Sequence, residues 1–133
     1  MHMVICLDDR NGMLFNGRRL SSDKAVCSRI REKAQGRLWM NAYSAKLFEG
    51  KQICVDASFL ELAEQADTCF VENADMCPWL AKAETITIYR WNRHYPSDVK
   101  FPVEAFRDSW RLVSTRSFPG YSHDEITEEI YQL

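Results

Sequence analysis

Asp23 is the residue whose type and position point most directly to chemistry. It ends the segment Leu20-Ser21-Ser22-Asp23, just before apolar residues that recur at helical spacing. A carboxylate placed there can accept two hydrogen bonds from paired donors on a ligand and can assist a proton transfer. Helix capping explains the same residue, because Ser and Asp are favoured at a helix start whatever the function. Both interpretations stay open from the residues alone.

The segment before Asp23 adds two further candidates. Arg18 and Arg19 stand close to Asp23 in the sequence, where they can meet an anionic group on a ligand. The loop from Asp9 to Leu20 contains two Asn-Gly pairs, which are typical of hairpin turns because both residues tolerate positive φ. This loop is either a lid over a pocket or a surface hairpin with apolar residues tucked in.

Other catalytic classes find little support in the residue pattern. The three histidines, His2, His94 and His123, are separated in the sequence and form no run of metal ligands, so we predict no metal site. The five cysteines include no Cys-x-x-Cys pair, and we expect reduced thiols used as small apolar side chains. Glycine-rich phosphate loops of the common kinds are missing from the sequence.

Length and charge narrow the class of protein. A chain of 133 residues predicts one domain, 1–133, with one sizeable core. The formal net charge is -2, which argues against nucleic acid as the partner. The apolar runs are too short to span a bilayer, and no charged-then-apolar leader opens the chain. We therefore expect a cytoplasmic protein with a small-molecule partner; the oligomeric state is left open.

Apolar runs alternate with helical patterns along the first two thirds of the chain. Met3 to Leu7 is continuously apolar, as expected of a buried parallel strand, and the clearest later strand is Thr85 to Trp91. Trp110 to Ser117 predicts an antiparallel strand. Glu125 to Tyr131 is ambiguous, because Ser122 and Glu125 have the form of a capping box, but a strand is favoured. The pattern predicts an α/β sandwich of three layers, with a mostly parallel central sheet and antiparallel C-terminal strands.

Within that architecture, the order of short motifs resembles the dihydrofolate reductase family over most of the chain. The motifs are the opening strand with Asp9-Arg10-Asn11-Gly12-Met13, Leu20-Ser21-Ser22-Asp23, Leu38-Trp39-Met40-Asn41, Cys69-Phe70-Val71-Glu72-Asn73-Ala74, Ile86-Thr87-Ile88-Tyr89, Asp98-Val99-Lys100-Phe101-Pro102 and Ser109-Trp110. Each motif is weak by itself, and their order and spacing carry the resemblance. It implies a dihydrofolate reductase-like fold.

The resemblance implies a substrate site around Asp23. The matching family carboxylate binds the aminopyrimidine edge of a pterin and supports its protonation, so Asp23 is the expected catalytic residue. Tyr89 stands where the family has a threonine, and we expect its hydroxyl to share a hydrogen bond with Asp23. The expected substrate-binding residues are Met3, Val4, Ile5, Cys27, Val71, Tyr89 and Arg18. Arg18 and Cys27 replace family aromatic residues, which predicts that stacking on the substrate is either weaker or made by other residues.

The cofactor positions depart from the family pattern. The family's Met-Gly-Arg-x-Thr segment corresponds to Met40-Asn41-Ala42-Tyr43-Ser44, and its glycine triplet to Glu72-Asn73-Ala74. The expected cofactor-binding residues are therefore reduced to Ser44, Asn41 and Asn73. Negative charge at Glu72 and Asp75 opposes a pyrophosphate, and the segment between Phe48 and Thr68 is short for the adenine side of the site. NADPH, the cofactor that the resemblance implies, is predicted to bind weakly or not at all.

The sequence leaves two functions open. The first is a divergent dihydrofolate reductase-like protein that binds a pterin- or aminopyrimidine-like heterocycle, with or without NADPH-dependent reduction. The second is a non-catalytic module on the same fold that binds a small ligand or a protein. The altered segments Asn41-Ala42 and Glu72-Asn73-Ala74 distinguish the two, because an enzyme would need another anchor for the phosphates.

Overall fold

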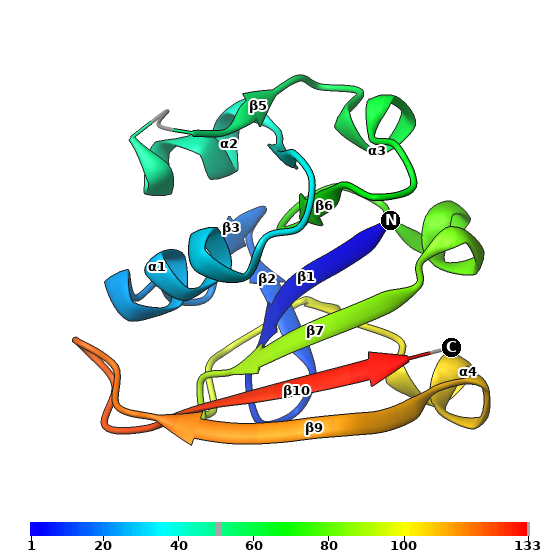
Figure 1. The fold of residues 1–133 in the computed structure, drawn as a ribbon. Coiled ribbons are helices and arrows are strands. Elements are labelled where there is room, and N and C mark those ends of the chain that lie inside the picture. Colours follow the sequence, from blue (N-terminus) through cyan, green and yellow to red (C-terminus); the bar gives the residue numbers. More distant parts are fainter. Residues whose placement is uncertain (50–51, 133) are drawn as a thin grey trace.

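A seven-stranded sheet forms the centre of the computed structural model, which describes residues 1–49 and 52–132 (Figure 1). Its strand order is β5-β4-β6-β1-β7-β10-β9. The strands are β1 (His2–Leu7), β4 (Leu38–Met40), β5 (Cys54–Val55), β6 (Thr68–Phe70), β7 (Thr85–Arg90), β9 (Arg111–Phe118) and β10 (Ile126–Gln132). Neighbours from β5 to β7 run parallel, whereas β10 is antiparallel to both β7 and β9.

The first strand lies in the interior of this sheet, as its apolar sequence predicts. β1 pairs with β6 on one side, where Met3 is opposite Cys69, and with β7 on the other, where Met3 is opposite Ile86. The predicted antiparallel pair at the end of the chain is also confirmed, because β9 pairs with β10. The ambiguous segment, Glu125 to Tyr131, is confirmed as a strand and not a helix, with bounds Ile126–Gln132. The mostly parallel α/β architecture is therefore confirmed.

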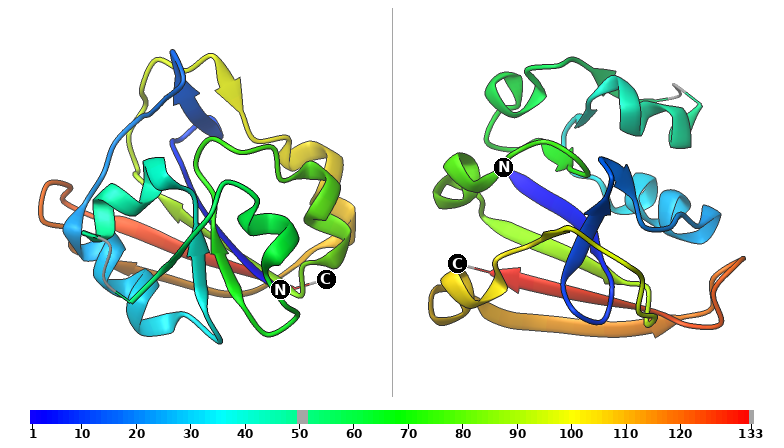
Figure 2. Two further views of the ribbon diagram at one scale, coloured as in Figure 1. Left: turned by 90° about the horizontal axis from the view of Figure 1, so that it is seen from above. Right: turned by 180° about the vertical axis from the view of Figure 1, so that it is seen from behind.

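Helices cover both faces of the sheet, as Figure 2 shows. One face carries α1 (Lys24–Lys33), α2 (Ala42–Ala45) and the short 3-10 helix η1 (Lys46–Phe48). The other carries α3 (Phe59–Leu62), α4 (Val103–Phe106), η2 (Cys77–Lys82) and η3 (Arg107–Ser109). The sandwich thus has the three layers that the sequence predicts.

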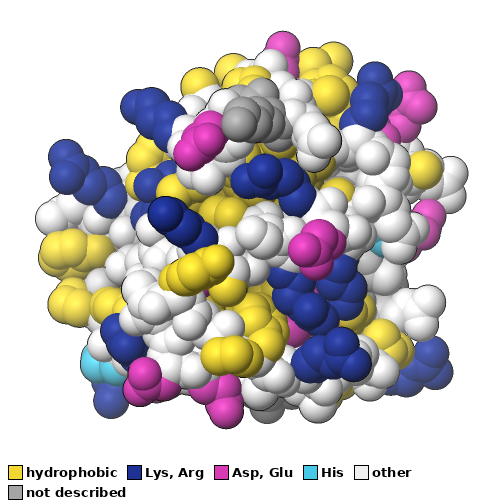
Figure 3. Space-filling model, turned by 60° about the vertical axis from the view of Figure 1, so that its left-hand side comes forward, with side chains coloured by type: hydrophobic (Ala, Val, Ile, Leu, Met, Phe, Trp, Pro, Cys, Tyr) yellow, Lys and Arg dark blue, Asp and Glu magenta, His cyan; other side chains and the backbone are white. Residues whose placement is uncertain are grey.

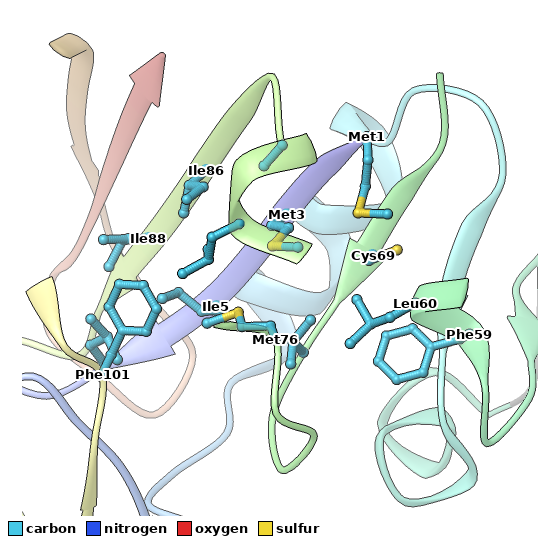
Figure 4. Packing of buried hydrophobic residues seen from close by; sticks show 14 residues of the cluster. Met1, Met3, Ile5, Phe59, Leu60, Cys69, Met76, Ile86, Ile88 and Phe101 are labelled. Carbon is cyan, nitrogen blue, oxygen red and sulfur yellow. The ribbon is translucent and has the colours of Figure 1, made fainter. Parts of the chain in front are cut away.

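Alternating side chains of β1 divide the core between these two faces. Met3 and Ile5 belong to the same core cluster as Phe59 of α3 (Figure 4). Leu80 of η2 belongs to it as well. Val4 points to the opposite face and packs with a cluster that includes Ile30 of α1. This alternation follows from the two-residue period of a strand, and it decides which face each predicted site residue can reach.

The segment from Asp9 to Leu20 forms a hairpin, not a loop without secondary structure. β2 (Gly12–Phe15) pairs with β3 (Arg18–Arg19) and with β8 (Val99–Lys100) in a small antiparallel sheet. Asn16 and Gly17 make the turn at φ 51° and 73°, as an Asn-Gly pair predicts. Leu14 is buried, so this segment packs onto the body of the protein.

Short helices lie between β7 and β9, where the sequence pattern indicates strands alone. These are α4 and η3, whereas β9 is followed directly by β10, as the sequence predicts. The edge strand β5 has only two residues, which fits the short segment between Phe48 and Thr68. In the described parts of the chain, no helix is long and apolar enough to cross a membrane.

Candidate functional site

Asp23 is buried at the start of α1 and accepts five hydrogen bonds, which define the Asp23 site. Its Oδ1 accepts from the backbone N–H groups of Ala25 at 2.8 Å and Tyr121 at 3.0 Å. Its Oδ2 accepts from the N–H of Ser122 at 2.9 Å and the Ser122 hydroxyl at 3.1 Å. The Nδ1 of His123 lies 2.9 Å from the same oxygen. Asp23 therefore caps α1 and also anchors the loop between β9 and β10.

These donors decide the charge of Asp23. Burial alone would raise the pKa of a carboxyl, but the hydrogen bonds from His123 and from backbone amides outweigh it and hold the pKa of Asp23 well below its ordinary value. The five donors use the lone pairs of both oxygens, so an aminopyrimidine could bind this carboxylate only by displacing some of them. Its role toward a ligand stays a prediction.

Gly120 permits the close approach of this loop. A Cβ atom at residue 120 would lie 2.6 Å from the Oδ2 of Asp23 and 2.9 Å from the carbonyl oxygen of His123. The Gly120 N–H donates to that carbonyl at 3.0 Å, which closes a tight turn over the carboxylate. Only glycine fits here without moving the loop.

A hollow of about 500 Å³ opens beside Asp23, between α1, η1 and the β9–β10 loop. Its lining consists of Ser22, Asp23, Lys24, Cys27, Lys46, Leu47, Glu49, Tyr121 and Ser122. Burial and the charge of Glu72 raise the pKa of the Cys27 thiol to about 11, so this thiol is uncharged at neutral pH. Tyr121 is 79% exposed at the hollow, which leaves an aromatic ring without a packing surface of its own.

The hydroxyl of Tyr89 is directed to a different carboxylate from the one expected. It donates to Glu128 of β10 at 2.9 Å. Arg29 and Lys33 of α1 bind the same buried carboxylate, at 2.5 Å and 3.0 Å for the closest atoms. Burial opposes ionisation of Glu128, but these donors lower its pKa to about 2. Figure 3 shows Lys and Arg side chains gathered on this side of the molecule.

The predicted substrate-binding residues are divided between the two faces of the sheet. Val4, Cys27 and Tyr89 belong to the cluster packed under α1, on the same face as Asp23. Met3, Ile5 and Val71 belong to the cluster on the opposite face. Arg18 lies in a third place, at a hollow lined by the β2–β3 hairpin and by residues 95–96.

A second buried carboxylate, Glu72, lies just beyond the carboxyl end of β6. Arg19 donates two hydrogen bonds to it, from Nε at 2.8 Å and from a terminal nitrogen at 3.0 Å. The Ser44 hydroxyl donates to it at 2.8 Å. The guanidinium carbon of Arg19 also lies 4.2 Å from the centre of the Tyr43 ring. Glu72, Arg19, Ser44 and Tyr43 are called the Glu72 site below.

The three predicted cofactor-binding residues meet at this same place. Asn41 caps α2 by accepting the N–H of Ser44 at 3.1 Å, and its amide nitrogen donates to the Asn73 side chain at 2.7 Å. Ser44 is buried, and its hydroxyl is committed to Glu72. A hollow of about 340 Å³ lies alongside, lined partly by Glu72, Asn73 and residues of β2 and β8.

Sequence reasoning missed the partners of both carboxylates. His123 seemed isolated because Asp23 lies 100 residues away along the chain. Glu72 was noted for repelling phosphate, but its pairing with Arg19 across 53 residues was not foreseen. No local signal marks either pair, because the partners lie far apart along the chain. Among the described residues, no three His, Cys, Asp or Glu side chains are grouped as metal ligands.

Comparisons with known proteins give a match to solved structures but none to a family model or a curated protein. Among solved structures, the chain is similar to a dihydrofolate reductase from Enterococcus faecalis complexed with NADP(H) and RAB-propyl, with a TM-score of 0.70. The match covers 98% of this chain and 94% of the other, at 11% sequence identity. At that identity the likeness concerns the fold.

Proposed function

Since the chain has a dihydrofolate reductase-like fold, as its motifs implied, we propose that it binds a planar heterocycle of pterin size in the hollow beside Asp23. In this proposal the protein acts as a small-ligand-binding module, and hydride transfer from NADPH is not its chemistry. The observation that carries the proposal is an exposed aromatic ring, Tyr121, at the edge of a hollow whose wall includes apolar groups.

The side chains that line the hollow are suited to binding a flat ring. Tyr121 offers one aromatic face, and Cys27 and Leu47 offer apolar contacts. The Lys24 and Lys46 side chains, both exposed, supply donors for polar edges of the ligand. Asp23 supports the pocket indirectly, because three of its five hydrogen bonds hold Tyr121 and Ser122 in place.

The Glu72 site supports the second part of the proposal. A pyrophosphate needs free donors at the ends of β4 and β6, but the Ser44 hydroxyl and the Arg19 guanidinium are both directed to Glu72. The carboxylate of Glu72 adds repulsion at the same strand end. NADPH binding would require breaking a buried ion pair, so we expect it to be weak.

Calorimetric titration with a pterin, 2,4-diaminopyrimidine, riboflavin and NADPH tests the proposal. We expect at least one heterocycle to bind and NADPH to bind weakly or not at all. Tyr121→Ala should weaken heterocycle binding by about tenfold, through the loss of one stacking contact. The matched control is Leu112→Ala, which removes a 49% exposed side chain on β9, away from the hollow. Equal binding by wild type and Tyr121→Ala would contradict the assignment of the hollow.

The second candidate is an NADPH-dependent reductase of the same heterocycle. Two observations favour it: the similar solved structure is a complex with NADP(H), and Asp23 stands at the start of α1, where the family has its substrate carboxylate. Low-micromolar or tighter binding of NADPH, together with oxidation of NADPH in the presence of a dihydropterin, would establish this candidate and overturn the first.

A further inference from the structure

His123 connects Asp23 to a serine hydroxyl. The Nδ1 of His123 lies 2.9 Å from the Oδ2 of Asp23, and its Nε2 lies 3.0 Å from the Oγ of Ser21. The hydroxyl of Tyr95 is 3.2 Å from the same Nε2 and 3.4 Å from the Ser21 Oγ. The Ser122 hydroxyl also lies 3.2 Å from Nδ1. The Asp23 carboxylate, the His123 imidazole and the Ser21 hydroxyl are therefore connected by a chain of hydrogen bonds.

The imidazole is held in the orientation that this sequence requires. His123 is 4% exposed, and its ring stacks on Trp91 with centroids 4.7 Å apart and planes 23° from parallel. Because the Asp23 carboxylate is ionised, its Oδ2 accepts the proton of Nδ1. In neutral His123 the lone pair of Nε2 then faces Ser21. This is the tautomer that a general base needs to take a proton from a serine.

Ser21 is partly exposed, whereas Asp23 and His123 are buried. The residue before it, Leu20, lines a hollow of about 530 Å³ together with Tyr95 and Arg18. Arg18 is exposed there, so its guanidinium can meet an anionic group. This hollow differs from the one beside Tyr121 in every lining residue.

We propose that Ser21, His123 and Asp23 form a hydrolytic triad, in which Ser21 attacks a small carboxylic ester that carries a negative charge. This activity goes beyond the proposed binding of a heterocycle, because the ester would lie next to Ser21 in the hollow that Arg18, Leu20 and Tyr95 line. The carboxylate orients the imidazole, the imidazole removes the hydroxyl proton, and Arg18 holds the charged end of the ester.

The reaction balances with water as the only co-reactant. The Ser21 Oγ bonds to the carbonyl carbon while its proton moves to Nε2 of His123. The bond from that carbon to the alcohol oxygen then breaks, and Nε2 returns the proton to the leaving alcohol. Water next attacks the acyl-serine and gives its proton to Nε2, which passes it to the departing Ser21 Oγ; a carboxylic acid is released. In this proposal the Tyr95 hydroxyl, which donates to the Ser21 Oγ at 3.4 Å, turns to the oxyanion and stabilises it.

An alkyl fluorophosphonate tests the nucleophile directly, because it bonds to an activated serine with loss of fluoride. Intact mass should show one adduct, and peptide mapping should place it on Ser21. Labelling should fall by about a hundredfold or more in Ser21→Ala and in His123→Gln. The matched control is Ser28→Ala, which removes an exposed serine from α1. Each variant's melting temperature shows whether it is folded.

Turnover of p-nitrophenyl acetate and of p-nitrophenyl succinate tests the substrate class. The protein should release more than one equivalent of nitrophenol and should favour the charged succinate ester. In Arg18→Ala the ratio of the succinate rate to the acetate rate should fall by about tenfold, the loss of one ionic contact. The proposal is overturned if wild type is not labelled, or if folded Ser21→Ala is labelled and hydrolyses esters like wild type.

Discussion

The Asp23 site and the Glu72 site both bury a carboxylate, but the chain compensates the two charges differently. Asp23 is held by backbone N–H groups, a hydroxyl and an imidazole, nearly all from the β9–β10 loop. Glu72 is held by one guanidinium and one hydroxyl. The first arrangement depends on the path of the backbone, whereas the second depends on two side chains. The Asp23 site should therefore respond to changes in the loop, and the Glu72 site to changes in its own side chains.

Removing the counter-charge of the Glu72 site should have the largest effect. Arg19→Ala leaves a buried carboxylate without its cation, so we expect the free energy of unfolding to fall by about 3 kcal/mol in urea titrations. Arg18→Ala removes the neighbouring exposed guanidinium and should change it by less than about 0.5 kcal/mol. Similar losses for the two variants would mean that the pair contributes nothing to stability.

Neutralising Asp23 should cost somewhat less. Asp23→Asn turns one oxygen into an NH₂ group that faces donors, so we expect a loss of about 2 kcal/mol at pH 7. If the ligand hollow is held by Asp23, binding of a heterocycle should weaken in this variant as well. An unchanged unfolding midpoint would show that the five hydrogen bonds add no net stability.

The effect of Asp23→Asn on the free energy of unfolding should depend on pH. The pKa of Asp23 is lower in the folded protein than its ordinary value of 3.8, so its stabilising contribution is present above that value and is lost as the pH falls through the folded-state pKa. The difference in unfolding free energy between wild type and Asp23→Asn should therefore shrink as the pH falls below about 4. Urea titrations between pH 3 and pH 7 measure it; a constant difference would contradict the burial of an ionised Asp23.

A methyl group at residue 120 should disturb the Asp23 site alone. Gly120→Ala places a Cβ 2.6 Å from the Oδ2 of Asp23, so the loop must move, at a cost of about 1–2 kcal/mol. Amide hydrogen exchange at Tyr121 and Ser122 should become faster. Gly17→Ala is the matched control: its strain comes from φ +73° with open space around it, and it should leave exchange at these two amides unchanged.

The smallest effect is expected from the hydroxyl of the Glu72 site. Ser44→Ala removes one donor to Glu72 but leaves both hydrogen bonds from Arg19, so we expect a loss of about 1 kcal/mol. Ser28→Ala, on the exposed side of α1, is the control in the same urea titration. A loss as large as that of Arg19→Ala would show that the hydroxyl, and not the cation, keeps the site intact.

The fold was predictable because its signals are local. Continuous apolar residues in β1 and the helical spacing of Val26, Cys27 and Ile30 can each be recognised within a few neighbours. The β10 segment shows the limit of such signals. Ser122 resembled the start of a helix, but its N–H and hydroxyl are both used by Asp23, and the segment that follows pairs as a strand.

The sites were only partly predictable because their contacts span the chain. Asp23, Ser44, Asn41 and Asn73 were singled out by the resemblance, and the last three do meet. The resemblance could not supply partners that the family motifs do not contain, such as His123 for Asp23 or Arg19 for Glu72. The sequence also did not predict on which face of the sheet each site residue lies, since that depends on the register of each strand.

The position of β10 between β7 and β9 has a consequence for how the protein folds. β9 precedes β10 in the chain but joins the sheet only through it, so this edge cannot form before the segment 126–132 is in place. The donors to Asp23 from residues 121–123 lie just ahead of that segment. Contacts so distant in sequence close slowly. We expect α1 to form early, when the N–H of Ala25 is the only donor to Asp23. The other donors should reach Asp23 in the final step of folding.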